Sequence, residues 1–191
     1  MFNSHCWRNY PNMAKPIRIN IKKEFSVNYT LSQVNKVVEQ IDIYPNHLDV
    51  IRKFIFDKDP RKNMRATWLL LHIAFKHPQL VKGEIPVLLK FLDQNNNHTG
   101  AIRNCVRIFM ELEIPEKYCA PIYDKCQSYV TNVALPHAVR VFAVYAMANI
   151  CKRFPELKQE LLIILDELKK YPQSPSMNAC LKKTYKNLLK L

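Results

Sequence analysis

Glycine is scarce in this chain of 191 residues, which contains only Gly83 and Gly100. Phosphate-binding loops, dinucleotide-binding turns and nucleophile elbows each need several glycines, because the backbone there approaches a ligand closely or takes positive φ angles. Two isolated glycines cannot supply any of these motifs. Their scarcity therefore excludes the commonest nucleotide-binding and hydrolase sites.

Long apolar runs and metal-binding spacings are also missing. The longest nearly apolar stretch, residues 68–75, is far shorter than the roughly 20 residues that a membrane-spanning helix needs. The histidines form neither HxH nor HExxH, and no CxxC occurs. The sequence thus predicts no membrane span, no metal site, no cofactor and no catalytic residue.

Cysteine usage points to a reducing compartment. Most of the six cysteines lie in apolar helical patterns, where a free thiol packs as a small hydrophobic group. Disulfide frameworks belong to oxidising environments instead. We therefore expect a cytoplasmic protein without disulfides.

Positive charge dominates the composition. Lysine and arginine number 29 against 16 acidic residues, which gives a formal net charge of +13. Such an excess attracts nucleic acid, an anionic membrane face or an acidic protein, but it also occurs on solvated surfaces that bind nothing anionic. Charge alone leaves these interpretations open.

An internal repeat is the main positive signal. Residues 66–80, ATWLLLHIAFKHPQL, return 77 positions later as AVYAMANICKRFPEL at residues 143–157, without a gap. A weaker copy occupies residues 102–118, midway between them. Repeats of about 38 residues, each with two helices joined near a proline, are typical of α-solenoids.

The remaining helices follow the same scheme. Helical periodicity begins near Thr30, and Asp59 and Pro60 have the residue types of an N-cap and a first helical position. Gly83 interrupts the second part of repeat two, and a polar-faced last helix over about 177–189 resembles the half-repeat that closes a solenoid. Residues 1–24 lack helical periodicity, and the alternation around Ile19 predicts a short extended segment there.

These paired helices and proline positions resemble the HEAT and armadillo class of helical repeats. The resemblance implies an all-α, right-handed solenoid of about four and a half two-helix repeats. We divide the chain into an irregular N-terminal arm, residues 1–24, and one repeat domain, residues 25–191. The resemblance further implies a non-catalytic binding or scaffold module that holds a protein or peptide on a concave helical surface.

Basic residues are the candidates for anion contacts. Arginines recur on the first helices of successive repeats, and stacking of the repeats could align them with phosphates: Arg65, Arg103, Arg107 and Arg140. The last helix adds Lys182, Lys183 and Lys186. Both sets are equally compatible with a solvated surface or a polar solenoid end.

His72 is the one histidine on a strongly apolar helix, and it aligns with Met110 and Asn149 of the later repeats. A ligand or catalytic role is one interpretation. A polar side chain that hydrogen-bonds across the interface between repeats is the simpler one.

Three functions remain in this order. A protein or peptide partner comes first, because that is the usual use of helical repeats. Nucleic-acid binding through the basic residues comes second. Third, HEAT-like alkylpurine DNA glycosylases resemble this chain as small basic helical-repeat proteins, although their DNA-contacting tryptophan has only Trp68 as a counterpart, and its neighbours mark it as core.

Overall fold

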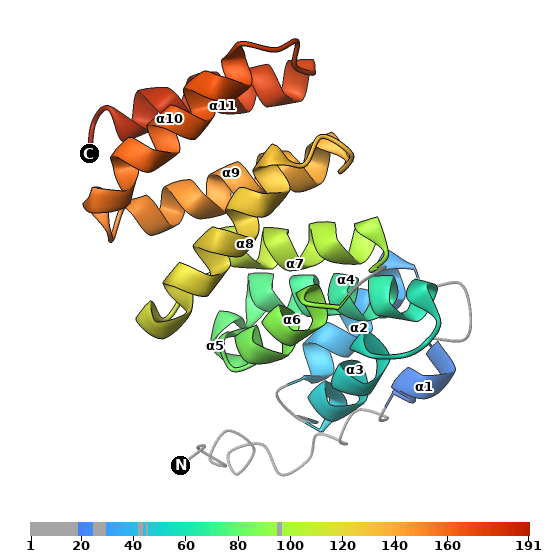
Figure 1. The fold of residues 1–191 in the computed structure, drawn as a ribbon. Coiled ribbons are helices and arrows are strands. Elements are labelled where there is room, and N and C mark those ends of the chain that lie inside the picture. The colour runs from blue at the N-terminus through green and yellow to red at the C-terminus, as the bar shows by residue number, and fades with distance from the viewer. Residues whose placement is uncertain (1–18, 25–29, 42–43, 45, 95–96) are drawn as a thin grey trace.

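The computed structural model describes residues 19–24, 30–41, 44, 46–94 and 97–191. All regular secondary structure among these residues is helical (Figure 1). No strand occurs among these residues. The helices are α1 (Ile21–Glu24), α2 (Leu31–Gln40), α3 (His47–Ile55), α4 (Pro60–Lys76), α5 (Pro78–Lys82), α6 (Ile85–Leu92), α7 (Thr99–Glu111), α8 (Cys119–Thr131), α9 (His137–Cys151), α10 (Lys158–Lys169) and α11 (Pro175–Leu188). Short 3-10 helices, η1 (Glu116–Tyr118) and η2 (Pro155–Leu157), precede α8 and α10.

The helices are stacked in repeats, as the sequence predicts. We call α2, α4, α7, α9 and α11 the first helices, and each packs against the next one in this order. The second helices are α3, α6, α8 and α10, of which α3 packs on α4, α8 on α9 and α10 on α11. Figure 1 shows the chain advancing from α1–α3 at one end to α10 and α11 at the other. The fold is therefore the predicted all-α solenoid of the HEAT type.

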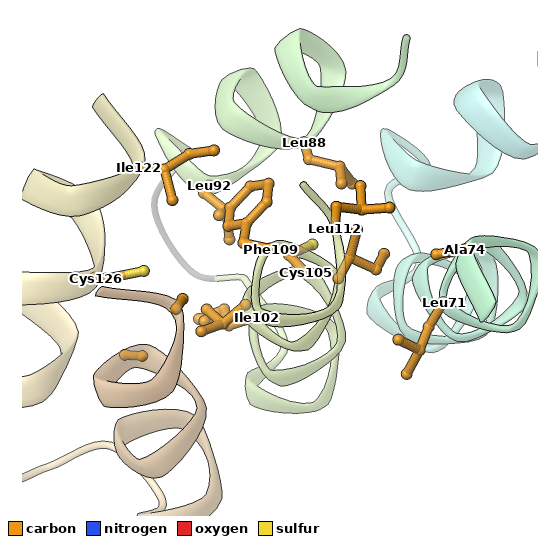
Figure 2. Close-up of a cluster of buried hydrophobic side chains, with 14 of the residues drawn as sticks. Leu71, Ala74, Leu88, Leu92, Ile102, Cys105, Phe109, Leu112, Ile122 and Cys126 are labelled. Atoms are coloured by element: carbon orange, nitrogen blue, oxygen red, sulfur yellow. The ribbon is translucent and has the colours of Figure 1, made fainter. Parts of the chain in front are cut away.

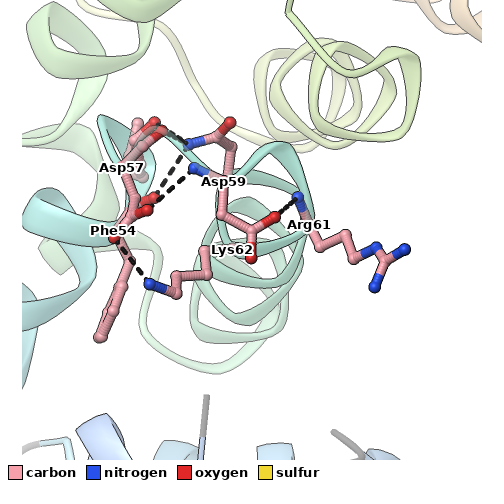
Figure 3. Close-up of polar contacts among 7 residues, drawn as sticks. Phe54, Asp57, Asp59, Arg61 and Lys62 are labelled. Atoms are coloured by element: carbon pink, nitrogen blue, oxygen red, sulfur yellow. Dashed lines mark hydrogen bonds and ion pairs between the residues drawn. The ribbon is translucent and has the colours of Figure 1, made fainter. Parts of the chain in front are cut away.

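Helix starts are fixed by local side chains at the predicted positions. The Asp59 carboxylate accepts a hydrogen bond from the backbone N–H of Arg61 at 2.9 Å, and Pro60 opens α4 (Figure 3). Asp57 accepts from the backbone N–H of Asp59 at 2.9 Å and pairs with Lys62 at 3.1 Å. These bonds satisfy N–H groups that have no partner within the helix and define where α4 begins.

The hydrophobic core runs between the repeats as one continuous cluster from α1 to α11. In its central part, side chains of α6, α7 and α8 meet around Phe109, which is 1% exposed, and Leu71 and Ala74 of α4 lie on the other side of α7 (Figure 2). Leu88 and Leu92 of α6 and Ile122 of α8 surround Phe109 from the second helices. A first helix such as α7 therefore buries both flanks, because it has a neighbouring repeat on each side.

Side-chain amides link α7 to α4 and α9 to α7. The Asn104 amide of α7 donates to the Met64 carbonyl of α4 and to the Thr67 hydroxyl, both at 3.2 Å. The Asn149 amide of α9 donates to the Met110 carbonyl of α7 at 2.8 Å. The Asn104 bonds span 40 residues to Met64 and 37 to Thr67, and the Asn149 bond spans 39. We refer to these three as the cross-repeat bonds; Asn104 is 2% exposed, and Asn149 is partly buried.

In each second helix, a backbone carbonyl of the last turn accepts a hydrogen bond from a side chain further along the chain. The donors on the following segments are Asn63 to Ile55 at 2.9 Å, Asn97 to Phe91 at 2.7 Å, Arg140 to Val130 at 3.0 Å and Gln173 to Leu168 at 2.8 Å. Carbonyls in the last turn of a helix lack intrahelical partners and need such donors when water is excluded. Four different sequence positions therefore perform the same structural task.

The N-terminal segment departs from its prediction. Much of it lies outside the described residues, but Ile21 opens the short helix α1 instead of continuing an extended strand, and its side chain is 3% exposed. The Asn20 side chain and carbonyl both accept from the backbone N–H of Lys23, at 3.2 and 3.0 Å, which starts the helical turn. The prediction of an extended segment is wrong at this point because Ile21 packs into the core at the first repeat.

Candidate interaction surface

Aromatic and cationic side chains alternate across four successive first helices. The set comprises Phe75 on α4, Arg107 on α7, Phe142 and Tyr145 on α9, and Lys183 on α11, and we call it the first-helix strip. The Arg107 guanidinium carbon lies 5.3 Å from the centre of the Phe75 ring and 5.5 Å from that of Phe142. The Lys183 ammonium lies 5.8 Å from the centre of the Tyr145 ring. Each cation thus faces a ring from a neighbouring repeat.

Arg107 is the centre of this arrangement. Its side chain is 42% exposed, and its Nε lies 3.8 Å from a Glu111 carboxylate oxygen one turn further along α7. Because both neighbouring rings come from other helices, the position of the guanidinium depends on how α4, α7 and α9 are stacked. Each cation–π contact at such a half-exposed site contributes about 0.5–1 kcal/mol. The two contacts therefore hold the arginine in one orientation while leaving part of it open to a partner.

His72 lies beside the strip on α4, between two aromatic rings. Its ring meets those of Trp68 and Phe75 edge-on, at centroid distances of 5.2 and 5.8 Å. Burial lowers the pKa of His72, and the positive charges of Arg107 and Lys76 lower this pKa further. The imidazole is therefore neutral at pH 7.

Only one of the aligned polar residues bonds across the repeat interface as predicted. Asn149 makes a cross-repeat bond, whereas His72 has ring contacts on its own helix. The aromatic column of α4 was not predicted as a surface feature, and Trp68 is only partly buried. The signal was the spacing of Trp68, His72 and Phe75 by three and four residues, which places all three on one face of a helix.

A groove of about 380 Å³ continues the strip between α9 and α11. Its lining includes Tyr145 and Lys183 of the strip, together with Asn149 and Lys152. Lys152 donates to the Asn149 side chain at 2.8 Å. The groove therefore adds amide and ammonium groups to the aromatic surface beside it.

The structure brings some of the predicted basic residues together and separates others. Arg103 and Arg107 lie one turn apart on α7, with Arg103 exposed, and Lys183 belongs to the strip. Arg65 is half-buried on α4, and Lys182 and Lys186 are exposed on α11.

Arg140 lies away from these residues. It is 3% exposed and caps the end of α8 through Val130. It occupies the position in α9 that Asn63 occupies in α4, so both side chains turn toward the preceding second helix. The alignment of Arg140 with the other arginines in sequence does not place it on their surface.

The described residues include histidine, cysteine and acidic side chains, the types that ligate metals or, for cysteine, act as thiol nucleophiles. They contain no group of three or more histidine, cysteine or acidic side chains placed to hold a metal ion. Their five cysteines are free and buried, and burial raises the pKa of Cys126 to about 12 and that of Cys151 to about 11, so these thiols stay protonated. None of the helices described is both long and apolar enough to cross a bilayer.

Comparison with known proteins gives a family and no individual relative. The sequence matches the HEAT repeat domain over residues 21–188, which run from the first residue of α1 to the last residue of α11. No curated protein and no solved structure matches it.

Removal of the Arg107 charge should raise the pKa of His72. In an Arg107→Gln variant, the pKa should move up toward 6.5, because one of the positive charges that disfavour the imidazolium is lost. Titration of the His72 ring protons by NMR measures this change, with Lys182→Gln as a control that removes a positive charge from α11. An unchanged pKa in Arg107→Gln would contradict the placement of Arg107 beside this ring.

The same depressed pKa predicts how stability depends on pH. Above pH 6.5 His72 is neutral in both folded and unfolded chains, so its contribution to stability is fully present there. As the pH falls below 6.5, the unfolded chain takes up the proton first, and this contribution is lost through the pKa of the folded state. Urea unfolding of the wild type and of His72→Gln at pH 7.5 and 5.0 should show a smaller loss in the variant.

Proposed function

The chain belongs to the HEAT repeat domain family, and on this premise we propose that it is a non-catalytic binding module whose first-helix strip holds a protein or peptide partner. Members of the family are helical-repeat scaffolds that often mediate protein interactions. The observation that carries the proposal is the alternation of rings and cations over α4, α7, α9 and α11. Catalysis is no part of the proposal.

The chemistry of the strip suits a protein interface. Arginine and the large aromatic side chains are the residues most enriched among those that dominate binding energy at interfaces. Phe75 is 43% exposed although it is a large apolar residue, so its ring gains burial when a partner covers it. Two rings already orient the Arg107 side chain, so this side chain loses little conformational entropy when a partner binds.

The charge of the strip favours an acidic partner. Arg107 and Lys183 of the strip and Arg103, one turn before Arg107, are part of the formal net charge of +13, while Glu111 is the acidic group beside Arg107. Complementary charge accelerates association and excludes basic competitors. We further propose a cytoplasmic location, which the free, buried cysteines support.

A paired variant should separate the strip from the rest of the surface. The tagged chain is isolated from the cells that make it, and the recovery of a stoichiometric partner is measured. The double variant Arg107→Glu with Phe142→Ala should reduce this recovery at least tenfold, because it removes the central cation and one of its rings together. Thermal unfolding of each variant first establishes that it is folded.

The matched control is Lys90→Glu with Phe56→Ala, which removes another cation and ring that lie 5.9 Å apart, outside the strip. This control should retain the partner. Equal loss of the partner from both double variants, or from neither, would refute the assignment of binding to the strip.

Nucleic-acid binding is the second candidate, because rings interleaved with arginine and lysine also form the surfaces that hold single strands. If a labelled single-stranded or duplex DNA binds, its log affinity should fall linearly with log salt, and Arg103→Glu with Lys183→Glu should flatten the slope. Fluorescence anisotropy measures both. Failure to bind at about 50 mM salt would remove this candidate, whereas release of bases from alkylated duplex DNA would favour the glycosylase instead.

A further inference from the structure

A second groove, of about 560 Å³, lies where α10 meets the end of α8 and the start of α9. Its walls are largely apolar and include Val133, Ile163 and Tyr171. These three side chains are 81%, 55% and 66% exposed, whereas most large apolar residues of the described chain are buried. A gathering of exposed apolar side chains around a groove is typical of a binding site.

Arg140 gives this groove a buried positive charge. The side chain lines the groove but is only 3% exposed. Its Nε donates to the Val130 carbonyl at 3.0 Å, while its buried Nη2 has no hydrogen-bond partner. The acidic side chain that also lines the groove, Glu167, is ion-paired with Lys170. Within the described residues, no carboxylate pairs with Arg140.

An acceptor from outside the chain would satisfy this donor. A buried donor without a partner costs about 1–3 kcal/mol, and more when it is charged. A carboxylate is the best complement, since it accepts charge-assisted hydrogen bonds from a guanidinium and neutralises its charge. Because the walls around Arg140 are largely apolar, the residues on either side of the carboxylate in the bound segment must be apolar.

We propose that this groove binds a segment of a partner protein in which an acidic side chain is flanked by large apolar residues. The carboxylate bonds to Nη2 of Arg140, and the flanking residues cover Val133, Ile163 and Tyr171. The groove is open to solvent instead of enclosed. This openness suits a peptide that enters at one end and leaves at the other, and it suits an enclosed small molecule less well.

This site is independent of the proposed function. It shares no residue with the first-helix strip, and its walls come from α8, α9, α10 and the loops after α8 and α10. Binding at the two surfaces can therefore be separated by substitution: a variant of the strip should leave the groove intact, and a variant of the groove wall should leave the strip intact.

The test is an NMR titration of the full chain with matched peptides. The probes are pentapeptides with a central Asp or Glu flanked by combinations of Leu, Ile, Val, Phe and Tyr, each paired with the same peptide carrying Asn or Gln. At least one acidic peptide should shift the resonances of Arg140 Nε, Ile163 and Tyr171. Its amide counterpart should bind at least tenfold more weakly, because it leaves the guanidinium without a counter-charge.

Variants locate the binding. Ile163→Ser should weaken the acidic peptide about tenfold without unfolding the chain, because this side chain is mostly exposed. Leu189→Ser, at another exposed apolar residue, and Arg107→Glu in the strip should leave the affinity unchanged. The proposal is overturned if no acidic peptide binds, if acidic and amide peptides bind equally, or if the shifts map to the strip.

Discussion

Hydrogen bonds from side-chain amides to the preceding first helix set the register of α4, α7 and α9, the central part of the stack. Apolar faces alone allow one helix to slide along another, because dispersion and hydrophobic contacts have little directional preference. Asn104 and Asn149 remove this freedom, since each amide bonds to a backbone carbonyl of the preceding first helix. A shift of α7 by a turn would leave the buried Asn104 amide without its acceptors.

The strip exists because of this register. Arg107 lies between rings of α4 and α9, so its contacts require all three first helices to keep their relative positions. The same register places Arg140 at the end of α8 and away from the surface of the other arginines. A single repeating scaffold therefore presents two kinds of arginine: Arg107 lies between two rings at the surface, and Arg140 is buried beside an apolar groove.

The sequence predicted the parts of the fold that local chemistry decides. The internal repeat, the Asp59 cap, the break at Gly83 and the closing helix are all found near their predicted positions, because periodicity and capping act within a few residues. The recurrence of arginine on first helices, however, did not reveal which way each side chain turns. Arg140 and Arg103 both lie on first helices, yet Arg140 is buried, where it caps the end of α8, and Arg103 is exposed. The helical turn at Ile21 likewise depends on the core of the first repeat, into which the Ile21 side chain packs.

Native-state hydrogen exchange of an Asn104→Leu variant tests most directly whether the cross-repeat bonds couple the first helices. Leucine has a similar volume but makes no hydrogen bond, so the loss should be about 1–3 kcal/mol. In a stack stabilised by contacts between neighbours, the backbone amides of both α4 and α7 should exchange faster, while those of α11 keep their protection. The control variant Asn187→Ala, on α11, should leave the exchange of α4 and α7 unchanged. In Asn104→Leu, exchange that is unchanged, or faster in α7 alone, would contradict the dependence of the stack on these bonds.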